Sequence, residues 1–205
     1  MQKMDANAYN MYRSYFWDLK NLYDSLVTND FFEQIENAFL AIKKSLDNGG
    51  KLLLFGNGGS ATEAAHLEAE LVCQFEKKRK AIPAIALTNS GAILTAQSND
   101  HIFDSVFERQ IEALGKEGDV AIGFTTSDVS INRDSGRSHS MNIFRGFLKA
   151  RSQKMATVGL VSQKTKQILA LIDHPIIIPH ESTDMIQNVH LSIVHILCKK
   201  IEQNL

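Results

Sequence analysis

Hydrophobic residues recur along this chain with two different spacings. Before residue 50 they return every three or four positions, as on one face of a helix, which predicts two helices. The apolar positions are Tyr9, Tyr12, Phe16, Leu19, Tyr23 and Leu26 in the first helix and Phe32, Ile35, Phe39 and Ile42 in the second. We expect Asp30 to cap the second helix and Gly49 and Gly50 to end it. A terminal helix this rich in aromatic residues needs a covering surface, either of its own domain or of another subunit.

After residue 50, short apolar runs alternate with helical patterns. The predicted strands are 51–55, 83–87, 119–124, 156–161 and 175–178. The predicted helices are 60–74, 92–97, 102–114, 138–153, 164–171 and 183–203. This alternation is typical of an α/β fold in which helices cover both faces of a doubly wound parallel sheet. The sequence contains neither an internal repeat nor a linker, so we expect residues 1–205 to form a single domain.

A glycine-rich loop, Gly56-Asn-Gly-Gly-Ser60, connects the first predicted strand to the helix after it. Its glycines permit close approach of a ligand, and Ser60 can cap a helix whose N-terminus favours an anion. The loop has no P-loop lysine and lacks the GxGxxG spacing, so a sugar phosphate fits it better than a nucleotide. On the loop alone, a tight turn without a ligand is an equally good interpretation.

A second polar loop, Thr125-Thr-Ser-Asp-Val-Ser130, follows the third predicted strand. Because the carboxyl ends of parallel strands meet at one edge of a sheet, both loops are expected at the edge where ligands bind. Together they favour a phosphate site more than either loop alone. The polar stretch 127–140, with Arg133 and Arg137, is either a lid or an exposed loop.

Two of the predicted helices carry candidate acid–base residues. His66 and Glu70 are four residues apart and therefore share one face of the helix after the glycine loop. In the last helix, Gln187 and His195 are separated by about 80° and by roughly 12 Å along the axis, so they share a ligand only if their side chains lean together. His190 lies about 140° from His195 and is expected to face elsewhere.

Composition narrows the classes of partner. The formal net charge of −1 favours neither nucleic acid nor an anionic membrane as a partner. Cys73 and Cys198 have no metal-type spacing and suit a reducing cytosol. The sequence has no signal peptide and no apolar run of about 20 residues, so we expect a cytoplasmic protein.

Three motifs together resemble those of the phosphoheptose isomerases: the glycine loop, His66-Leu-Glu-Ala-Glu70, and Ile186-Gln-Asn-Val-His190 followed by His195. These sugar isomerase (SIS) domain enzymes convert sedoheptulose 7-phosphate into D-glycero-D-manno-heptose 7-phosphate. The resemblance covers essentially the whole chain. It implies a three-layer α/β sandwich with a flavodoxin-like five-stranded parallel sheet and extra N-terminal helices. It also implies a homotetramer with active sites between subunits and with residues 1–48 in the interface.

The resemblance further implies roles for individual residues. Glu70 and His195 match the catalytic pair. The ligands of one zinc ion per subunit match His66, Glu70, Gln187 and His195. The substrate-binding positions match Asn57, Gly58, Gly59, Ser60, Asn99, Asp100, Thr125, Thr126, Ser127, Ser130, Asp184 and Gln187. Aldose–ketose isomerisation moves a proton between neighbouring carbons through an enediol, so it needs a base, an acid and a group that polarises the carbonyl.

The chain departs from the family pattern at several positions. Asp128 stands where the phosphate loop has a glycine, and its charge should weaken phosphate binding unless the side chain points away. The chain is also longer between this loop and the next helix, and an alternative alignment makes 135–138 the phosphate loop. Gln74 replaces an arginine and Ser90 replaces an aspartate, so the exact sugar phosphate stays open.

Functions of two different classes remain open. The first is an isomerase of heptose 7-phosphate or of a related sugar phosphate. The second is a non-catalytic SIS protein that binds a sugar phosphate or a partner protein, because such relatives keep the fold without the catalytic pair. The presence of Glu70, Gln187 and His195 favours the enzyme.

Overall fold

The computed structural model of the chain describes residues 5–131 and 138–204. The helices are α1 (Ala6–Ser25), α2 (Asn29–Asp47), α3 (Gly59–Val72), α4 (Gly91–Asp100), α5 (Val106–Leu114), α6 (Met141–Ser152) and α7 (Thr183–Gln203), with two short 3-10 helices, η1 (Phe103–Ser105) and η2 (Leu169–Leu171). The strands are β1 (Leu52–Gly56), β2 (Ala84–Ala86), β3 (Val120–Phe124), β4 (Ser130–Ile131), β5 (Ser138–His139), β6 (Ala156–Ser162) and β7 (His174–Ile178). The five strands predicted from apolar runs are all present, each within one residue of its predicted ends.

These five strands form one parallel sheet in the order β2-β1-β3-β6-β7. From β1 the chain moves outward to β2 and then returns to the other side of β1 to form β3. The strand order therefore reverses between β1 and β3, and ligands of such sheets bind beyond the carboxyl ends of the strands at that reversal. The predicted α/β architecture with a flavodoxin-like sheet is confirmed.

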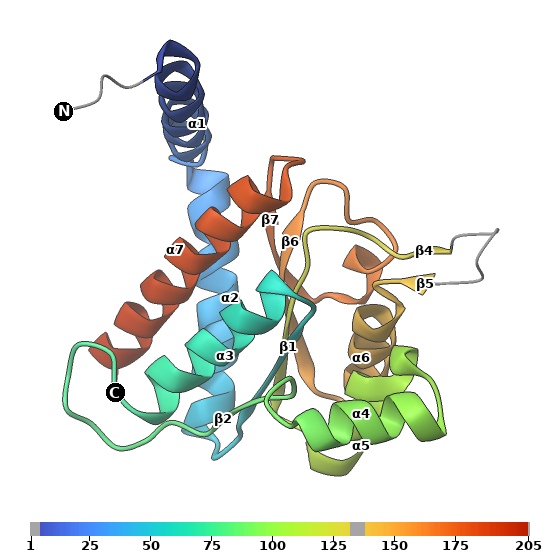
Figure 1. The fold of residues 1–205 in the computed structure, drawn as a ribbon. Coiled ribbons are helices and arrows are strands. Elements are labelled where there is room, and N and C mark those ends of the chain that lie inside the picture. Colours follow the sequence, from blue (N-terminus) through green and yellow to red (C-terminus); the bar gives the residue numbers. More distant parts are fainter. Residues whose placement is uncertain (1–4, 132–137, 205) are drawn as a thin grey trace.

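Helices cover both faces of the sheet (Figure 1), and every residue of β1 and β3 is buried. Leu52 and Leu54 face a core that contains side chains of α2, α3 and α7. Leu53 and Phe55 face the opposite core, which contains side chains of α5 and α6. This alternation follows from the two-residue period of a strand, and it makes β1 the apolar centre of three layers.

The α-helix predicted over 164–171 is wrong, since only the 3-10 helix η2 forms at its end. The backbone N–H groups of Lys166, Gln167 and Ile168 donate instead to the carboxylate of Asp128, at 2.9, 2.8 and 3.1 Å. A side chain from a distant loop thus supplies the acceptors that a helix would otherwise provide.

Several predicted helix starts are also wrong. In the helix predicted over 102–114, the 3-10 helix η1 forms first and α5 begins only at Val106. Helix α6 begins at Met141 instead of 138, because β4 and β5 pair as a short antiparallel hairpin immediately before it. Helix α2 is capped by Thr28, whose hydroxyl accepts a hydrogen bond from the N–H of Phe31 at 3.2 Å. Asp30 lies inside the first turn, where its charge still suits the N-terminus of the helix.

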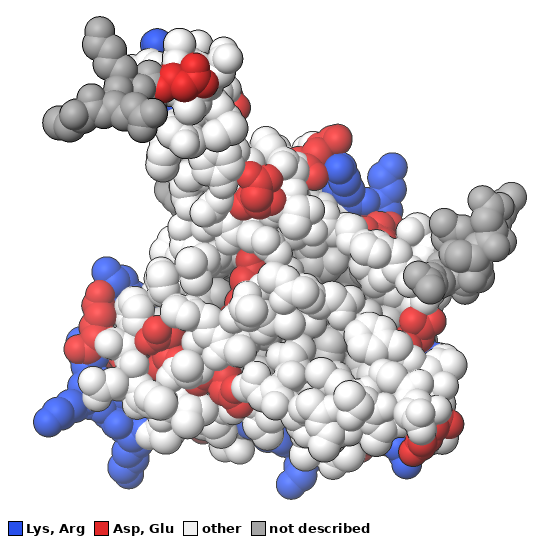
Figure 2. Space-filling view, viewed as in Figure 1, with Lys and Arg blue, Asp and Glu red and all other residues white. Residues whose placement is uncertain are grey.

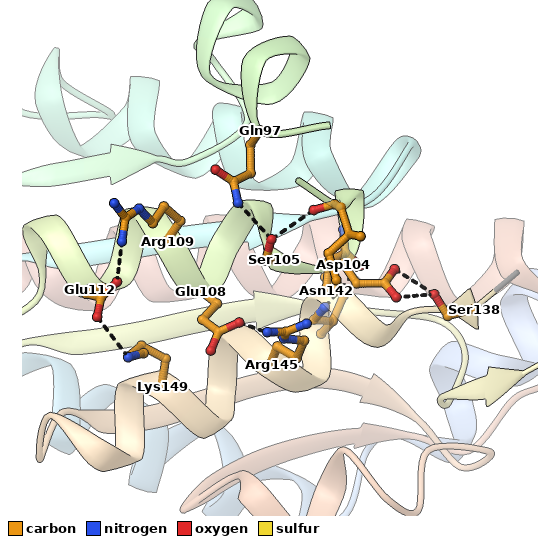
Figure 3. A network of polar contacts seen from close by, with 12 residues as sticks. Gln97, Asp104, Ser105, Glu108, Arg109, Glu112, Ser138, Asn142, Arg145 and Lys149 are labelled. Carbon is orange, nitrogen blue, oxygen red and sulfur yellow. Dashed lines mark hydrogen bonds and ion pairs between the residues drawn. The ribbon is translucent and has the colours of Figure 1, made fainter. Parts of the chain in front are cut away.

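A network of polar side chains joins η1, α5, α6 and the first residue of β5 (Figure 3). Arg145 of α6 donates to Glu108 of α5 at 2.6 Å. Ser138, at the start of β5, donates to Asp104 of η1 at 2.6 Å. These contacts fix the hairpin beside the N-terminus of α6.

Helix α1 projects from the body of the molecule (Figure 1), and on the face shown in Figure 2 it carries few charged side chains. Its large exposed side chains are Tyr9, Met11, Tyr12, Tyr15, Phe16 and Trp17. Its middle and its C-terminal part contact α7: the side-chain amide of Asn188 donates to the hydroxyl of Tyr15 at 3.0 Å, and the hydroxyl of Tyr23 donates to the carbonyl of Asn188 at 3.1 Å. No helix in the described part of the chain is long and apolar enough to cross a membrane.

Candidate active site

The loop after β1 turns sharply into α3. Gly58 has a φ of 56°, a conformation that glycine adopts without strain, and it forms the N-cap of the helix. The predicted cap by Ser60 is wrong, because Ser60 is buried inside the first turn. No side chain of the described residues caps α3, so an anion-favouring helix end lies at the carboxyl edge of the sheet.

An open groove of about 450 Å³ lies between α3 and α7 and starts at this loop. Four of the predicted site residues line it, namely Gly59, His66, Asp184 and Gln187. A side chain at position 59 would overlap the amide of Gln187, so the glycine allows α7 to approach the loop closely. The groove therefore joins the glycine loop to the last helix, as the predicted site requires.

His66, Glu70 and His195 form a contact cluster between α3 and α7, which we call the His–Glu cluster. The Nε2 atom of His66 lies 3.1 Å from Nε2 of His195 and 3.4 Å from a carboxylate oxygen of Glu70. The side chains of His66 and Glu70 are 39% and 23% exposed, so both remain accessible to a substrate. Gln187 and His195 lie about two turns apart on α7, and His66 connects them, because it lines the groove with Gln187 and also contacts His195.

His190 faces away from the His–Glu cluster, as its position on the helix predicts. It is fully buried, and its Nδ1 atom lies 3.3 Å from a carboxylate oxygen of Glu63. Glu63 is itself buried and lines the groove. A buried His–Glu pair therefore forms a polar contact between α3 and α7 beside the candidate site.

The second polar loop lies next to the glycine loop, because β1 and β3 are paired up to Gly56 and Phe124. The hydroxyl of Thr125 donates to the carbonyl of Ser127 at 2.8 Å. The hydroxyl of Thr126 lies 3.3 Å from that of Thr183, at the start of α7. Ser130 is instead exposed on β4, where it pairs with β5.

Two residues that sequence reasoning missed lie beside Ser127. Its hydroxyl oxygen is 2.8 Å from Nε2 of His139 and 3.1 Å from the hydroxyl oxygen of Ser140. Ser140 immediately precedes α6 and does not cap this helix with its side chain. Asn142 and Asn57 exchange hydrogen bonds of 2.7 and 2.9 Å, which tie α6 to the glycine loop. In the sequence, Ser140 and Asn142 precede the apolar positions of α6, and this pattern could have indicated a polar helix start there.

Comparison with known proteins identifies the family. A family model of the SIS domain matches residues 14–162. The phosphoheptose isomerase of Aquifex aeolicus is 40% identical over 173 residues, which cover 84% of this chain and 85% of that protein. The phosphoheptose isomerase of Geotalea daltonii is 43% identical over 161 residues, which cover 78% and 79% of the two chains. This chain belongs to the phosphoheptose isomerase family.

Solved structures of phosphoheptose isomerases have the same fold as this chain. The enzyme from Francisella tularensis matches with a TM-score of 0.86 and 32% identity, over 96% of this chain and 98% of its own. The enzyme from Neisseria gonorrhoeae matches with a TM-score of 0.82 and 29% identity, over 96% and 99%. The SIS fold expected from the sequence is thereby confirmed.

Asp128 is the acidic departure from the phosphoheptose isomerase pattern, and its carboxylate points toward the turn after β6. Burial acts to raise the pKa of Asp128, but hydrogen bonds from the N–H groups of Gln167, Ile168 and Lys166 outweigh it and hold the pKa below its usual value. The carboxylate is therefore charged and matched by N–H dipoles. The side chain of Asp128 is thus bound to the turn after β6.

The departure at Ser90 and the two predicted substrate-binding residues Asn99 and Asp100 are absent from the groove lining. Ser90 caps α4 by accepting a hydrogen bond from the N–H of Ile93 at 3.3 Å. Asn99 donates to Asp100 at 2.8 Å near the end of α4, and both are exposed and absent from the groove lining. The alternative phosphate loop at 135–138, like Arg133 and Arg137, falls almost entirely outside the described residues.

The His–Glu cluster and Gln187 suit the metal that the family implies. Within the described ranges, no three His, Cys, Asp or Glu side chains are arranged as a preformed metal centre. Zinc takes nitrogen and oxygen ligands, and two ligands at about 2.0 Å from one tetrahedral ion lie about 3.3 Å apart. The 3.1 Å between the Nε2 atoms of His66 and His195 is close to that spacing. The residues therefore fit zinc if Glu70 and Gln187 rotate toward the two imidazoles.

Proposed function

We propose that this chain is a phosphoheptose isomerase that interconverts sedoheptulose 7-phosphate and D-glycero-D-manno-heptose 7-phosphate through an enediol. Family membership supports this function, and the observation that carries it is the His–Glu cluster beside a groove that begins at the glycine loop. The cluster offers a base and an acid, and the two loops offer a separate end for the phosphate. Such an enzyme belongs to carbohydrate metabolism.

The phosphate is assigned to the edge between the glycine loop and Thr125–Ser127. The N-termini of α3 and α6, whose N-cap residues Gly58 and Ser140 make no side-chain hydrogen bond to the helix, both favour an anion there. Ser60, Ser127 and Ser140 supply hydroxyls, and Asn57 is held in place by α6. The two loops bind the phosphate and orient the substrate, so that its carbonyl group lies in the groove.

Proton transfer is assigned to Glu70 and His195. Glu70 accepts the proton from the carbon next to the carbonyl, and His195 moves the proton between the two oxygens. Asp184 lines the groove, and a hydrogen bond from the hydroxyl of Ser182 holds its pKa below the usual value. Its carboxylate is therefore charged and can accept hydrogen bonds from sugar hydroxyls.

One zinc ion is assigned to His66, Glu70, Gln187 and His195. Bound there, zinc would act as a Lewis acid that polarises the sugar carbonyl. The two unpaired thiols, Cys73 and Cys198, are consistent with a reducing cytoplasm, where we place the protein.

We also assign the chain to a single-domain homotetramer in which residues 1–48 form part of the interface. The aromatic side chains of α1 support this, with Phe16 at 69% and Trp17 at 59% exposure. We expect Phe16→Asp combined with Trp17→Asp to reduce the mass measured by analytical ultracentrifugation. Leu114→Asp, at an exposed site on α5, is the control. A wild-type chain that sediments as a monomer at micromolar concentration would contradict the assignment.

His139 provides a prediction specific to the β4–β5 hairpin of this chain. Its Nε2 atom lies 2.8 Å from the hydroxyl oxygen of Ser127, within reach of a phosphate held there. A hydrogen bond to a charged group contributes about 1.5–3 kcal/mol, so we expect His139→Ala to raise KM by roughly 10- to 150-fold with little change in kcat. His101→Ala, at an exposed histidine after α4, should leave both constants unchanged. An unaltered KM for His139→Ala would exclude the contact.

The function is tested by proton NMR of the purified protein with sedoheptulose 7-phosphate in D₂O and added zinc. Formation of an aldoheptose phosphate, with deuterium at C2 if the proton exchanges with solvent, is the expected result. If the protein converts only a different sugar phosphate, the proposed reaction is correct and the proposed substrate is wrong. Binding of sedoheptulose 7-phosphate without conversion, with zinc bound, would favour a non-catalytic SIS protein.

A further inference from the structure

Phe75 stacks on the imidazole of His195. The two ring centroids are 5.5 Å apart and the ring planes differ by only 17°. His66 meets the same imidazole in an edge-to-face arrangement, with centroids 5.2 Å apart and planes at 68°. Phe75 lies in the loop that follows α3, so this contact joins that loop to the middle of α7.

The loop that carries Phe75 is held by a buried carboxylate at the end of α7. Glu202 accepts hydrogen bonds from the backbone N–H groups of Phe75, Glu76 and Lys77, at 3.0, 2.9 and 3.0 Å. Its side chain is only 2% exposed. Glu202 follows His195 by seven residues, which puts both side chains on nearly the same face of α7.

Arg79 completes this arrangement. Its guanidinium donates to Glu202 at 2.9 Å and is only 7% exposed. It also donates to the carbonyls of Glu70 and Leu71 near the end of α3, at 2.6 and 2.7 Å. A buried charge is costly unless it is paired and hydrogen-bonded, and here both charges are. The Arg79–Glu202 pair therefore joins the helix of Glu70, the loop of Phe75 and the helix of His195.

We propose that Phe75 is a positioning residue for His195 and that the Arg79–Glu202 pair holds Phe75 in place. The inference rests on the proposed function, in which His195 moves the proton between the substrate oxygens. The outer torsion of a histidine side chain has a broad preference, so neighbouring groups must set the plane of the ring. Phe75 covers one face of the imidazole, and His66 limits its rotation from another direction.

The test compares Phe75→Leu, which removes the ring, with Phe75→Tyr, which keeps it. We expect Phe75→Leu to lower kcat by roughly 10- to 100-fold with little change in KM, because a misplaced catalytic group costs rate more than binding. Phe75→Tyr should restore most of the activity. Phe103→Leu, at a half-exposed phenylalanine in η1, is the matched control and should behave like the wild type.

A second measurement does not depend on activity. In the proton NMR spectrum of the wild type, the ring current of Phe75 should shift the His195 ring protons upfield, and their signals are identified by their absence in His195→Gln. Phe75→Leu should remove this shift and Phe75→Tyr should keep it. If Phe75→Leu does not fold, the wild-type spectrum still decides, since unshifted His195 signals there would refute the stacking.

The proposal is overturned if folded Phe75→Leu keeps both its kcat and the upfield shift of His195. It is equally overturned if the shift disappears while kcat is unchanged, because the contact would then be structural only. A wild-type protein that shows the upfield shift but converts no sugar phosphate would refute the proposed function alone. The two failures are therefore distinguishable.

Discussion

Glu70→Gln is expected to reduce kcat by about 10²–10⁴-fold, the contribution of a general base in the transition state. Glutamine has nearly the same shape as glutamate, so the contact with His66 and the packing of α3 should survive. The missing property is the ability to accept a proton from carbon. The measurement is the rate of conversion of sedoheptulose 7-phosphate, followed by proton NMR in the presence of zinc.

Substrate binding to Glu70→Gln should be weakened much less than turnover. The loops assigned to the phosphate lie beyond β1 and β3, whereas Glu70 is near the far end of α3. Calorimetric titration of the variant with sedoheptulose 7-phosphate measures this directly. Glu68→Gln is the matched control, because Glu68 lies on another face of α3 and contacts Asn89. Full activity of Glu70→Gln would show that another group is the base.

The sheet was predictable because the sequence of each strand by itself indicates that the strand is buried. Each central strand is an apolar run buried on both faces, so its position depends little on distant residues. The segment 164–171 was not predictable in this way. Its backbone N–H groups are taken by Asp128, about forty positions earlier in the chain, and helical periodicity contains no trace of such a contact.

The candidate site was predictable in its components and less so in its geometry. Spacing within α3 placed His66 and Glu70 on one face, but the 3.1 Å contact with His195 depends on how α3 packs on α7. The contacts of Phe75 with His195 and of Glu63 with His190 were not predicted for the same reason. An isolated phenylalanine or glutamate has no distinguishing pattern until tertiary packing places it against a histidine.

The insertion before α6 shows a further limit of sequence reasoning. The family resemblance predicts Ser130 as a substrate-binding residue, whereas the structure places Ser140 next to Ser127 and leaves Ser130 exposed on β4. Ser130 lies in the β4–β5 pair, and Ser140, which follows β5, lies beside Ser127 instead. Only the pairing of β4 with β5 reveals this exchange.

The second large effect is expected from Phe147→Ala, which should lower the free energy of unfolding by about 3–5 kcal/mol. Phe147 is fully buried, and its ring packs on Phe55 with centroids 5.0 Å apart and planes at 63°. It also fills the space over Gly123, where any side chain would collide with it. Removing the ring therefore opens a cavity beneath the two central strands.

Urea denaturation of both proteins at one fixed concentration measures this loss, because dissociation of an oligomer would otherwise shift the midpoint. Leu148→Ala is the matched control. Leu148 is next to Phe147 on α6 but is 50% exposed, so its removal should lower the free energy of unfolding by about 0.5 kcal/mol or less. Equal losses in the two variants would contradict the assignment of Phe147 to the core.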